Sequence, residues 1–358
     1  MTAGAHRTGR VVIPVVIPVV IPVVAVAVAL SGCGERTGVR ATPDNDNPPI
    51  DVSYRVTATV PVGKGPNGIA VDSGTHAVYV TNTEDGSVSV IDGTTRTVTG
   101  RIPVGNKPWA VAVDPSTNTI FVTHLFDNIV SVIDGSTRAV TATVAVGRLP
   151  VDVAVDPNTH LVYVPNANDE TLSVIDPTTS TVVDTVSVGA NQQGVAVDPA
   201  TNTVYVITEM FAANRPATGA DVVSVIDAST RTVTHTIPVG TGPRGVVVDT
   251  REHVVYVANV GESTVSAIDG RTRAVVATVP VPSISASGGL AVDPDTRTVY
   301  AVTGRGDSVA VIDGSARAVR DTVPVGRGPR GVAVDPDTHA VYVTNSDAGT
   351  VSVIETGP

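Results

Sequence analysis

The chain repeats one unit seven times, and this repetition constrains the fold more than any other feature of the sequence. A Val-Asp pair ends the first apolar segment of each unit and recurs at intervals of 42, 42, 42, 51, 44 and 42 residues. The aspartates of these pairs are Asp72, Asp114, Asp156, Asp198, Asp249, Asp293 and Asp335. A period in the forties, with four short strand signals in each unit, is typical of the blades of a β-propeller. The sequence therefore predicts an all-β, seven-bladed β-propeller.

Each of the first six units contains four valine-rich segments that are separated by turn residues, and the seventh contains three. In the first unit these segments are 68–71, 77–81, 87–91 and 97–104. The first two segments are commonly joined by Asp-Pro-x-Thr, in which proline presets a turn geometry and aspartate accepts hydrogen bonds from turn N–H groups. The last two are joined by Asp-Gly in several units, as at Asp92-Gly93, which is a strong hairpin signal. We expect four-stranded antiparallel blades.

Proline marks the outer edge of the blades. It occurs in the fourth segment at Pro61, Pro103, Pro238, Pro280 and Pro324. A central strand cannot accept proline without losing a ladder hydrogen bond, so the fourth segment is expected at the rim and the first at the axis. The seventh unit ends without a fourth segment, whereas a lone segment at Tyr54–Val62 opens the repeat region. We expect this segment to pair with the third strand of the last blade and close the ring.

The residues before the repeats predict an export signal. His6, Arg7 and Arg10 precede an apolar run over 11–30, and no acidic residue occurs before Glu35. This arrangement is typical of a secretory signal. The run is long enough to span a bilayer, but three prolines within it disfavour a stable helix. A retained anchor is the alternative.

The end of the apolar run predicts lipidation. Leu30-Ser31-Gly32-Cys33 resembles the lipobox of bacterial lipoproteins, and Cys33 is the only cysteine of the chain. The resemblance implies cleavage before Cys33 and attachment of the protein to a membrane through the lipidated cysteine. We therefore expect a lipoprotein signal peptide at 1–33, a flexible tether at 34–53 and the propeller at 54–356. The predicted location is extracytoplasmic, anchored by lipid to the bacterial cell membrane.

Charge and cysteine content exclude several classes of function. The formal net charge is −11 and the sequence pI is about 5.0, which argues against a nucleic-acid partner because phosphate binding requires a basic surface. One cysteine excludes a disulfide framework, a thiolate zinc site within one chain and C-x-x-C-H haem attachment. The sequence contains no G-x-S-x-G, H-E-x-x-H or Walker-type motif. We predict no cofactor and no resident metal.

Residues that recur in every unit are expected to be structural. The repeat aspartates occupy turn positions, where they satisfy backbone N–H groups. A single catalytic site, in contrast, requires residues that differ between the units. An aromatic position in the second segment is expected to pack neighbouring blades together, and its occupants are Tyr79, Phe121, Tyr163, Tyr205, Tyr256, Tyr300 and Tyr342.

Ligand-binding residues are sought where the units differ. The position five residues before each repeat aspartate is expected at the mouth of the axial channel, and it is occupied by Asn67, Trp109, Val151, Gln193, Arg244, Gly288 and Arg330. Two of these are arginines suited to a carboxylate or phosphate, and Trp109 is the only tryptophan. The end of the second segment adds His124, which stands where other units have asparagine. The structural alternatives are a solvated rim for the arginines and an exposed substitution for His124.

The fourth unit contains a nine-residue insertion within Glu209–Asp221. We hypothesise that ligand recognition uses the funnel between the fourth and sixth blades, with Arg244 at its base and residues from the insertion as a flap. The predicted ligand-binding set is Arg244, Arg330, Trp109, Gln193, Asn67, His124, Glu209, Met210, Phe211 and Arg215.

The second and third segments carry a family resemblance. The second segment reads Val78-Tyr79-Val80-Thr81-Asn82, with near copies in other units, and the third reads Val-Ser-Val-Ile-Asp at 88–92 and 130–134. The chain thereby resembles the YVTN-repeat β-propeller family, which includes YncE-like and surface-layer-associated proteins. Related propellers include lactonases, a streptogramin lyase and quinoprotein dehydrogenase subunits, while many members have no assigned activity. The resemblance therefore implies a fold more strongly than a function.

Two functions from different classes remain open. The first is a non-catalytic, monomeric propeller on the cell envelope that binds an envelope protein or small ligand at its loop face. The alternative is a metal-assisted lactonase or lyase in the same funnel, which requires several convergent oxygen or imidazole ligands. A funnel lined by Asn, Gln, Arg and valine favours binding. An electron-transfer subunit is a third option, although the chain carries no motif that ligates a redox cofactor.

Overall fold

The computed structural model describes residues 53–189, 191–209 and 221–357. The predicted signal peptide, the lipidation site Cys33 and nearly all of the tether lie outside the described residues, as do Met210, Phe211 and Arg215 of the predicted flap. No helix among the described residues has the length and apolar character needed to cross a membrane.

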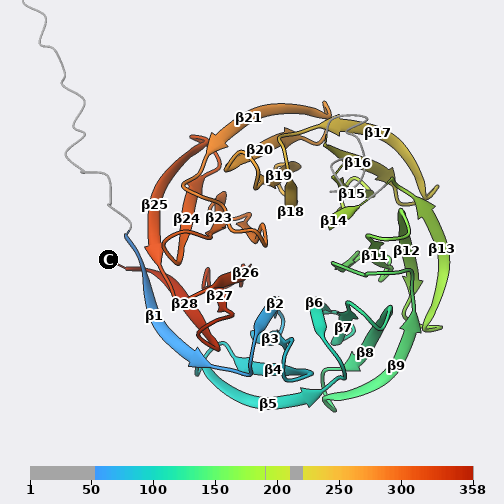
Figure 1. Ribbon diagram of the computed structural model, residues 1–358, viewed down its shortest axis with the longest axis horizontal. Helices are drawn as coiled ribbons and strands as arrows, with labels where there is room; N and C mark the ends of the chain where they lie inside the picture. Colours follow the sequence, from blue (N-terminus) through green and yellow to red (C-terminus); the bar gives the residue numbers. More distant parts are fainter. Residues whose placement is uncertain (1–52, 190, 210–220, 358) are drawn as a thin grey trace, which may run out of the picture. The chain divides into compact units, whose positions relative to one another are not determined.

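The described chain folds into seven four-stranded sheets arranged around a common axis (Figure 1). Blade 1 contains β2 (Pro66–Asp72), β3 (Ala77–Asn82), β4 (Ser87–Asp92) and β5 (Thr97–Pro103), and blade 2 contains β6 (Pro108–Asp114), β7 (Thr119–His124), β8 (Ile129–Asp134) and β9 (Ala139–Ala145). Blade 3 contains β10 (Ala154–Val155), β11 (Val162–Asn166), β12 (Thr171–Asp176) and β13 (Thr181–Ser187), and blade 4 contains β14 (Gln192–Asp198), β15 (Thr203–Thr208), β16 (Val222–Asp227) and β17 (Thr232–Pro238).

The remaining three blades follow the same plan. Blade 5 contains β18 (Pro243–Asp249), β19 (Val254–Asn259), β20 (Thr264–Asp269) and β21 (Ala274–Pro280). Blade 6 contains β22 (Leu290–Asp293), β23 (Thr298–Thr303), β24 (Ser308–Asp313) and β25 (Ala318–Pro324). Blade 7 contains β26 (Pro329–Val334), β27 (Val341–Asn345) and β28 (Thr350–Gly357), to which β1 (Ser53–Pro61) is added. The predicted seven-bladed propeller of four-stranded antiparallel blades is confirmed.

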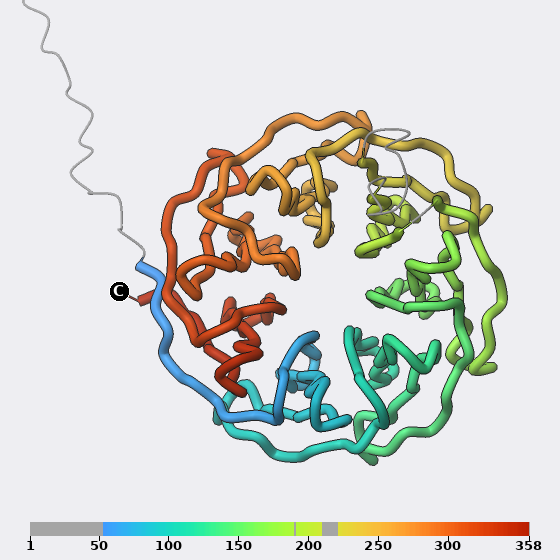
Figure 2. The backbone as a smooth tube through the Cα atoms, in the orientation of Figure 1, coloured from blue at the N-terminus to red at the C-terminus, as the bar shows by residue number. Residues whose placement is uncertain are grey.

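The strands of blades 1 to 6 follow chain order from the axis to the rim, as Figure 2 shows by the position of the successive segments, and in blade 7 the outermost strand is β1. In blade 1 the order is β2-β3-β4-β5. Prolines end five of the seven outermost strands, as at Pro103 opposite Ser87. At the edge of a sheet the missing N–H of proline breaks no hydrogen bond between central strands. The predicted order of strands is therefore confirmed.

The ring is closed by its first strand. β1 pairs antiparallel with β28, from Ser53 opposite Gly357 to Pro61 opposite Thr350, as the blue and red ends in Figure 2 show. The ring of Tyr54 meets the edge of Tyr300 at 6.1 Å between centroids, and the guanidinium of Arg320 lies 5.7 Å from the Tyr54 ring. The closing strand thus binds blade 6 as well as blade 7, and the predicted closure is confirmed.

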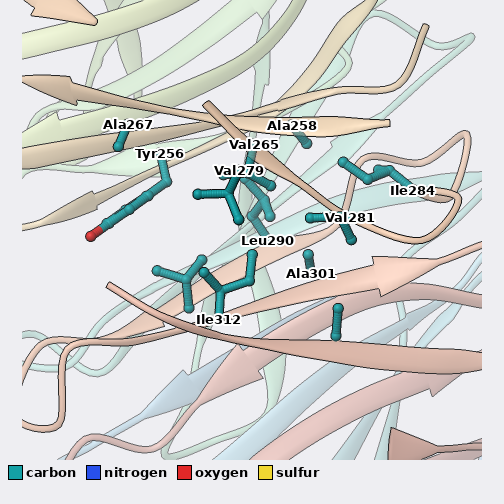
Figure 3. Close-up of a cluster of buried hydrophobic side chains, with 12 residues drawn as sticks. Tyr256, Ala258, Val265, Ala267, Val279, Val281, Ile284, Leu290, Ala301 and Ile312 are labelled. Carbon is teal, nitrogen blue, oxygen red and sulfur yellow. The ribbon is translucent and has the colours of Figure 1, made fainter. Parts of the chain in front are cut away.

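The hydrophobic core lies between blades. The cluster in Figure 3 joins Tyr256 and Val265 of blade 5 to Leu290 and Ile312 of blade 6. Each of the seven aromatic positions in the second strands is at most 4% exposed. These aromatic rings pack between neighbouring blades, as the repeat pattern predicts, because a large side chain in the middle of one sheet fills the space between it and the sheet of the next blade.

The repeat aspartates are buried at the hairpins between first and second strands. Their carboxylates accept hydrogen bonds from turn N–H groups, as Asp72 does from Gly74 at 2.9 Å. Four of them also accept a hydrogen bond from a histidine of the following blade, in the pairs Asp335–His76, Asp114–His160, Asp198–His253 and Asp293–His339. Sequence analysis predicted the turn role but not these contacts between blades.

Candidate functional site

A cavity of about 770 Å³ lies at the axis, bounded by the N-terminal parts of the inner strands. All seven residues that occupy the position five before the repeat aspartate line its wall: Asn67, Trp109, Val151, Gln193, Arg244, Gly288 and Arg330. They meet because the same register position of each inner strand faces the axis. Apolar residues of these strands, such as Ile69, Val111 and Val332, line the cavity beside them.

A connected polar network lies at the cavity at blades 4 and 5. Asn191, Gln193 and Arg244 line the cavity, whereas their partner Glu209 is not among the lining residues. Arg244 donates to Oε1 of Gln193 at 2.6 Å and lies 3.4 Å from Oε2 of Glu209. Asn191 donates to the same Glu209 oxygen at 2.9 Å, and Gln193 donates to Oδ1 of Asn191 at 2.8 Å. Burial raises the pKa of the Glu209 carboxyl, although Arg244 beside it favours the charged form. Arg244 is therefore held in place and its charge is partly compensated.

Arg330 in blade 7 differs from Arg244. Its side chain is exposed and lines the cavity. Among residues 53–189, 191–209 and 221–357, its guanidinium has no hydrogen-bond or ion-pair partner. Its main chain is fixed, because its carbonyl oxygen accepts a hydrogen bond from Ser287 at 2.9 Å. The cavity wall therefore contains an arginine whose main chain is fixed and whose charge the described residues do not compensate.

Trp109 and Asn67 form the wall at blades 1 and 2. Asn67 donates from Nδ2 to the carbonyl oxygen of Trp109 at 3.1 Å, and Thr81 donates to the same oxygen at 2.8 Å. The indole is half-buried and packs beside the hydrophobic cluster between blades 2 and 3. These contacts fix the backbone of Trp109, so its ring is a defined part of the cavity wall.

His124 lies inside blade 2 and away from the cavity wall. It is fully buried, with Nδ1 at 2.8 Å from the carbonyl oxygen of Asn106 and Nε2 at 2.9 Å from Oγ of Ser131. The asparagines at the same position make equivalent contacts, as Asn82 does with Ser89 at 2.9 Å. Contrary to the expectation from sequence, His124 does not line the cavity and serves the interior of blade 2.

Asp152 is a cavity residue that sequence analysis missed. It occupies the position four before the repeat aspartate, where the other six units have glycine or alanine. Those units need a small residue because the next blade is close: a Cβ on Gly245 would lie 1.9 Å from the carbonyl oxygen of Gly288. In blade 3 the inner strand is shortened to β10, and Asp152 precedes it. An acid among six small residues at equivalent positions was the available signal.

The Asp152 carboxylate joins blades 3 and 4 at the cavity wall. It accepts hydrogen bonds from the N–H of Val195 at 3.0 Å and of Val153 at 2.9 Å. Burial nevertheless raises its pKa to about 6, because desolvation outweighs these two bonds. The cavity thus has a titratable acid on blade 3 and cations on blades 5 and 7.

The described residues contain one group of three His, Asp or Glu side chains whose ligand atoms all lie within 4.8 Å of one another. It comprises His76, Asp335 and Asp337, none of which lines the cavity. The acids in the cavity wall are Asp152 and Asp347, without a histidine beside them in the lining.

Comparison with known proteins supports the fold. Residues 215–358 match the family described as lactonase, 7-bladed beta-propeller, which is less than half of the chain. A solved structure of Kuenenia stuttgartiensis hydrazine synthase is similar with a TM-score of 0.72 and 21% sequence identity, over 82% of this chain and 96% of that one. At this identity the likeness concerns architecture alone. No curated protein matches the chain.

Proposed function

We propose that this protein is a non-catalytic binding propeller that captures a small carboxylate ligand in its axial cavity. The observation that carries the proposal is Arg330 in the wall of a cavity of about 770 Å³. Its main chain is fixed by Ser287, and its guanidinium has no partner among the described residues. Cavities of roughly 300–1,000 Å³ are the usual size for small-molecule sites. A guanidinium offers paired donors that match the two oxygens of a carboxylate.

Arg244, the second arginine of the cavity wall, supports the proposal in a different way from Arg330. Arg244 already binds Gln193 and lies beside Glu209, so its remaining donors are held at a defined position. A ligand carboxylate on Arg330 places the body of the ligand among the valines and leucines of the inner strands. Trp109 supplies an aromatic surface on blade 2, so an apolar or aromatic body suits the cavity best.

We also propose that the protein works on the outer side of a bacterial cell membrane. The support is the apolar run at 11–30 and the lipobox-like residues that end at Cys33. A soluble ligand collected outside the cell is consistent with an open cavity at the loop face. The proposed partner classes are the membrane, through Cys33, and a small ligand; an envelope protein is the alternative occupant.

A second candidate function is hydrolysis of a lactone in the same cavity. It is favoured by the match of residues 215–358 to the lactonase propeller family. Asp152, with its pKa raised to about 6, is the residue of this cavity best suited to accept a proton from an attacking water near neutral pH.

The proposal is tested with Trp109, the only tryptophan of the chain, as a fluorescent reporter. Phenylacetate and phenylacetamide serve as probes, since they differ chiefly in the charge of one group. We expect saturable quenching by phenylacetate and at least tenfold weaker binding of the amide. Arg330→Met should weaken phenylacetate binding about 10–100-fold, because a hydrogen bond to a charged group contributes about 1.5–3 kcal/mol.

Arg327→Met is the matched control, because Arg327 is an exposed arginine three residues away that does not line the cavity. Equal binding of the acid and the amide, or equal affinity of the Arg330→Met variant and the wild type, would contradict the proposal. Hydrolysis of δ-gluconolactone that is lost in Asp152→Asn but kept in Arg327→Met would establish the second candidate instead.

A further inference from the structure

The face opposite the cavity carries the four contacts between a repeat aspartate and a histidine of the next blade. The cavity residues lie near the start of each inner strand, and the repeat aspartates lie at its end, so the two groups are at opposite ends of the strands. In each pair a buried carboxylate accepts a hydrogen bond from Nδ1 of histidine at 2.7–2.8 Å. Each of these pairs joins two neighbouring blades.

The pair at the junction of blades 7 and 1 has a third member. The carboxylate of Asp337 comes within 4.8 Å of the ligand atoms of His76 and Asp335. Asp335 is buried, His76 is partly exposed and Asp337 is exposed. Among the residues that the structure describes, the Asp337 carboxylate has no hydrogen-bond or ion-pair partner. One imidazole nitrogen and two carboxylates therefore converge, with one side open to solvent.

The junction of blades 6 and 7 is an internal comparison. Its pair is Asp293 with His339, and Asp295 stands where the first junction has Asp337. Here Asp295 forms an ion pair with Arg251, and the three groups do not converge as a cluster. The two junctions thus share the same residue types and differ in whether the third carboxylate is free.

We propose that His76, Asp335 and Asp337 bind one divalent transition-metal ion, with Zn²⁺ as the representative. One imidazole and two carboxylates, with further positions left for water, are a suitable ligand set for such an ion. Nδ1 of His76 and Oδ2 of Asp335 are 2.8 Å apart, so two metal bonds of about 2.0–2.1 Å would enclose an angle of about 85–90°. Zn²⁺ prefers the wider tetrahedral angle, so these two atoms would move apart to about 3.3 Å when the ion replaces the hydrogen bond.

Metal binding would replace the hydrogen bond of this pair. Asp335 accepts the proton of Nδ1 in the metal-free protein. The ion takes the place of that proton, and the imidazole stays neutral because it carries its proton on Nε2 instead. Two carboxylates and a neutral imidazole then compensate the charge of a divalent cation. Because His76 belongs to blade 1 and both aspartates belong to blade 7, the ion would join the two blades at which the ring closes.

The test is isothermal titration of ZnCl₂ into tag-free, metal-stripped full-length protein, with MgCl₂ as the comparison ion. We expect one tight Zn²⁺ per chain and at least tenfold weaker Mg²⁺ binding. Asp337→Asn should weaken the Zn²⁺ site at least tenfold, whereas Asp295→Asn should leave it unchanged. The exposed position of Asp337 makes the substitution compatible with folding, which circular dichroism checks.

Arg251→Ala provides a gain-of-function test, because it releases Asp295 beside Asp293 and His339. We expect a second Zn²⁺ per chain in this variant. Zn²⁺ should also raise the melting temperature of the wild type by several degrees and that of Asp337→Asn by clearly less. Equal Zn²⁺ affinity of the wild type and Asp337→Asn would overturn the proposal, as would a failure of Arg251→Ala to gain a site. Neither outcome bears on ligand binding in the axial cavity.

Discussion

Replacement of Asp152 by asparagine is expected to remove a specific part of the pH dependence of folding. The carboxyl lies in the cavity wall, where burial raises its pKa from 3.8 to about 6. Asparagine has nearly the same shape and can still accept a hydrogen bond from Val195, but it does not titrate. The comparison of wild type and variant therefore isolates the carboxyl from the other acidic groups of the chain.

The direction in which stability changes with pH follows from proton binding by the folded and unfolded states. Because the pKa is higher in the folded state, this group's contribution to stability is fully present below about pH 4 and is lost as the pH rises through about 6. A shift of about two units, at about 1.36 kcal/mol per unit, corresponds to about 3 kcal/mol. Part of this effect lies below pH 4, so the free energy of unfolding of the wild type, relative to Asp152→Asn, should fall by about 2.5 kcal/mol between pH 4 and pH 7.5.

The assay is urea unfolding at several pH values between 4 and 7.5, followed by Trp109 fluorescence and far-ultraviolet circular dichroism. Asp176→Asn is the control: hydrogen bonds from Thr178 lower the pKa of that exposed carboxyl, so its effect on stability lies below pH 4 and should be constant over this range. A constant difference between wild type and Asp152→Asn would refute the reasoning, because it would mean that the cavity wall does not desolvate the acid.

Three further predictions concern the ring and its anchor. Gly245→Ala should lower the free energy of unfolding by about 3 kcal/mol in calorimetry, because its Cβ would collide with the carbonyl oxygen of Gly288 and overpacking destabilises a protein. Gly74→Ala is the control: its Cβ would meet only a carboxylate oxygen at 3.3 Å, so the loss of stability should be far smaller. Tyr54→Ala should lower the free energy of unfolding in urea by about 2 kcal/mol, because the ring loses its contacts with Tyr300 and Arg320. Tyr54→Phe keeps the ring, so its free energy of unfolding should stay close to that of the wild type. Cys33→Ser should move the protein from the detergent phase to the aqueous phase in Triton partitioning of cells, and an unchanged distribution would argue against lipidation.

The architecture was predictable because each blade repeats the same local signals. The Val-Asp period determined the number of blades, and the lone strand at the start predicted the closure. The position five before the repeat aspartate led to the cavity for the same reason, since equivalent register positions of seven inner strands face one axis.

The errors arose where a residue's surroundings come from a distant part of the chain. His124 was expected at the cavity because polar residues at a strand end are commonly exposed, but the pleat turns this position into the blade, toward Ser131. Asp152 was missed because the shortened inner strand of blade 3 is not visible in the repeat spacing. The contacts of His76 and its equivalents join residues of different blades, and a repeat pattern does not specify which side chains of adjacent blades meet.

The pairing of β1 with β28 has a consequence for how the molecule is made. Ser53 lies opposite Gly357 in the pairing of these strands, so β1 stays unpaired during synthesis until β28 has been made. Contacts of such high sequence separation form late and slowly. Any nascent or prematurely ended chain would expose a bare sheet edge on each side of the gap, and such edges favour association between chains. We therefore expect partly synthesised chains to associate with one another more readily than chains in which β28 has paired with β1.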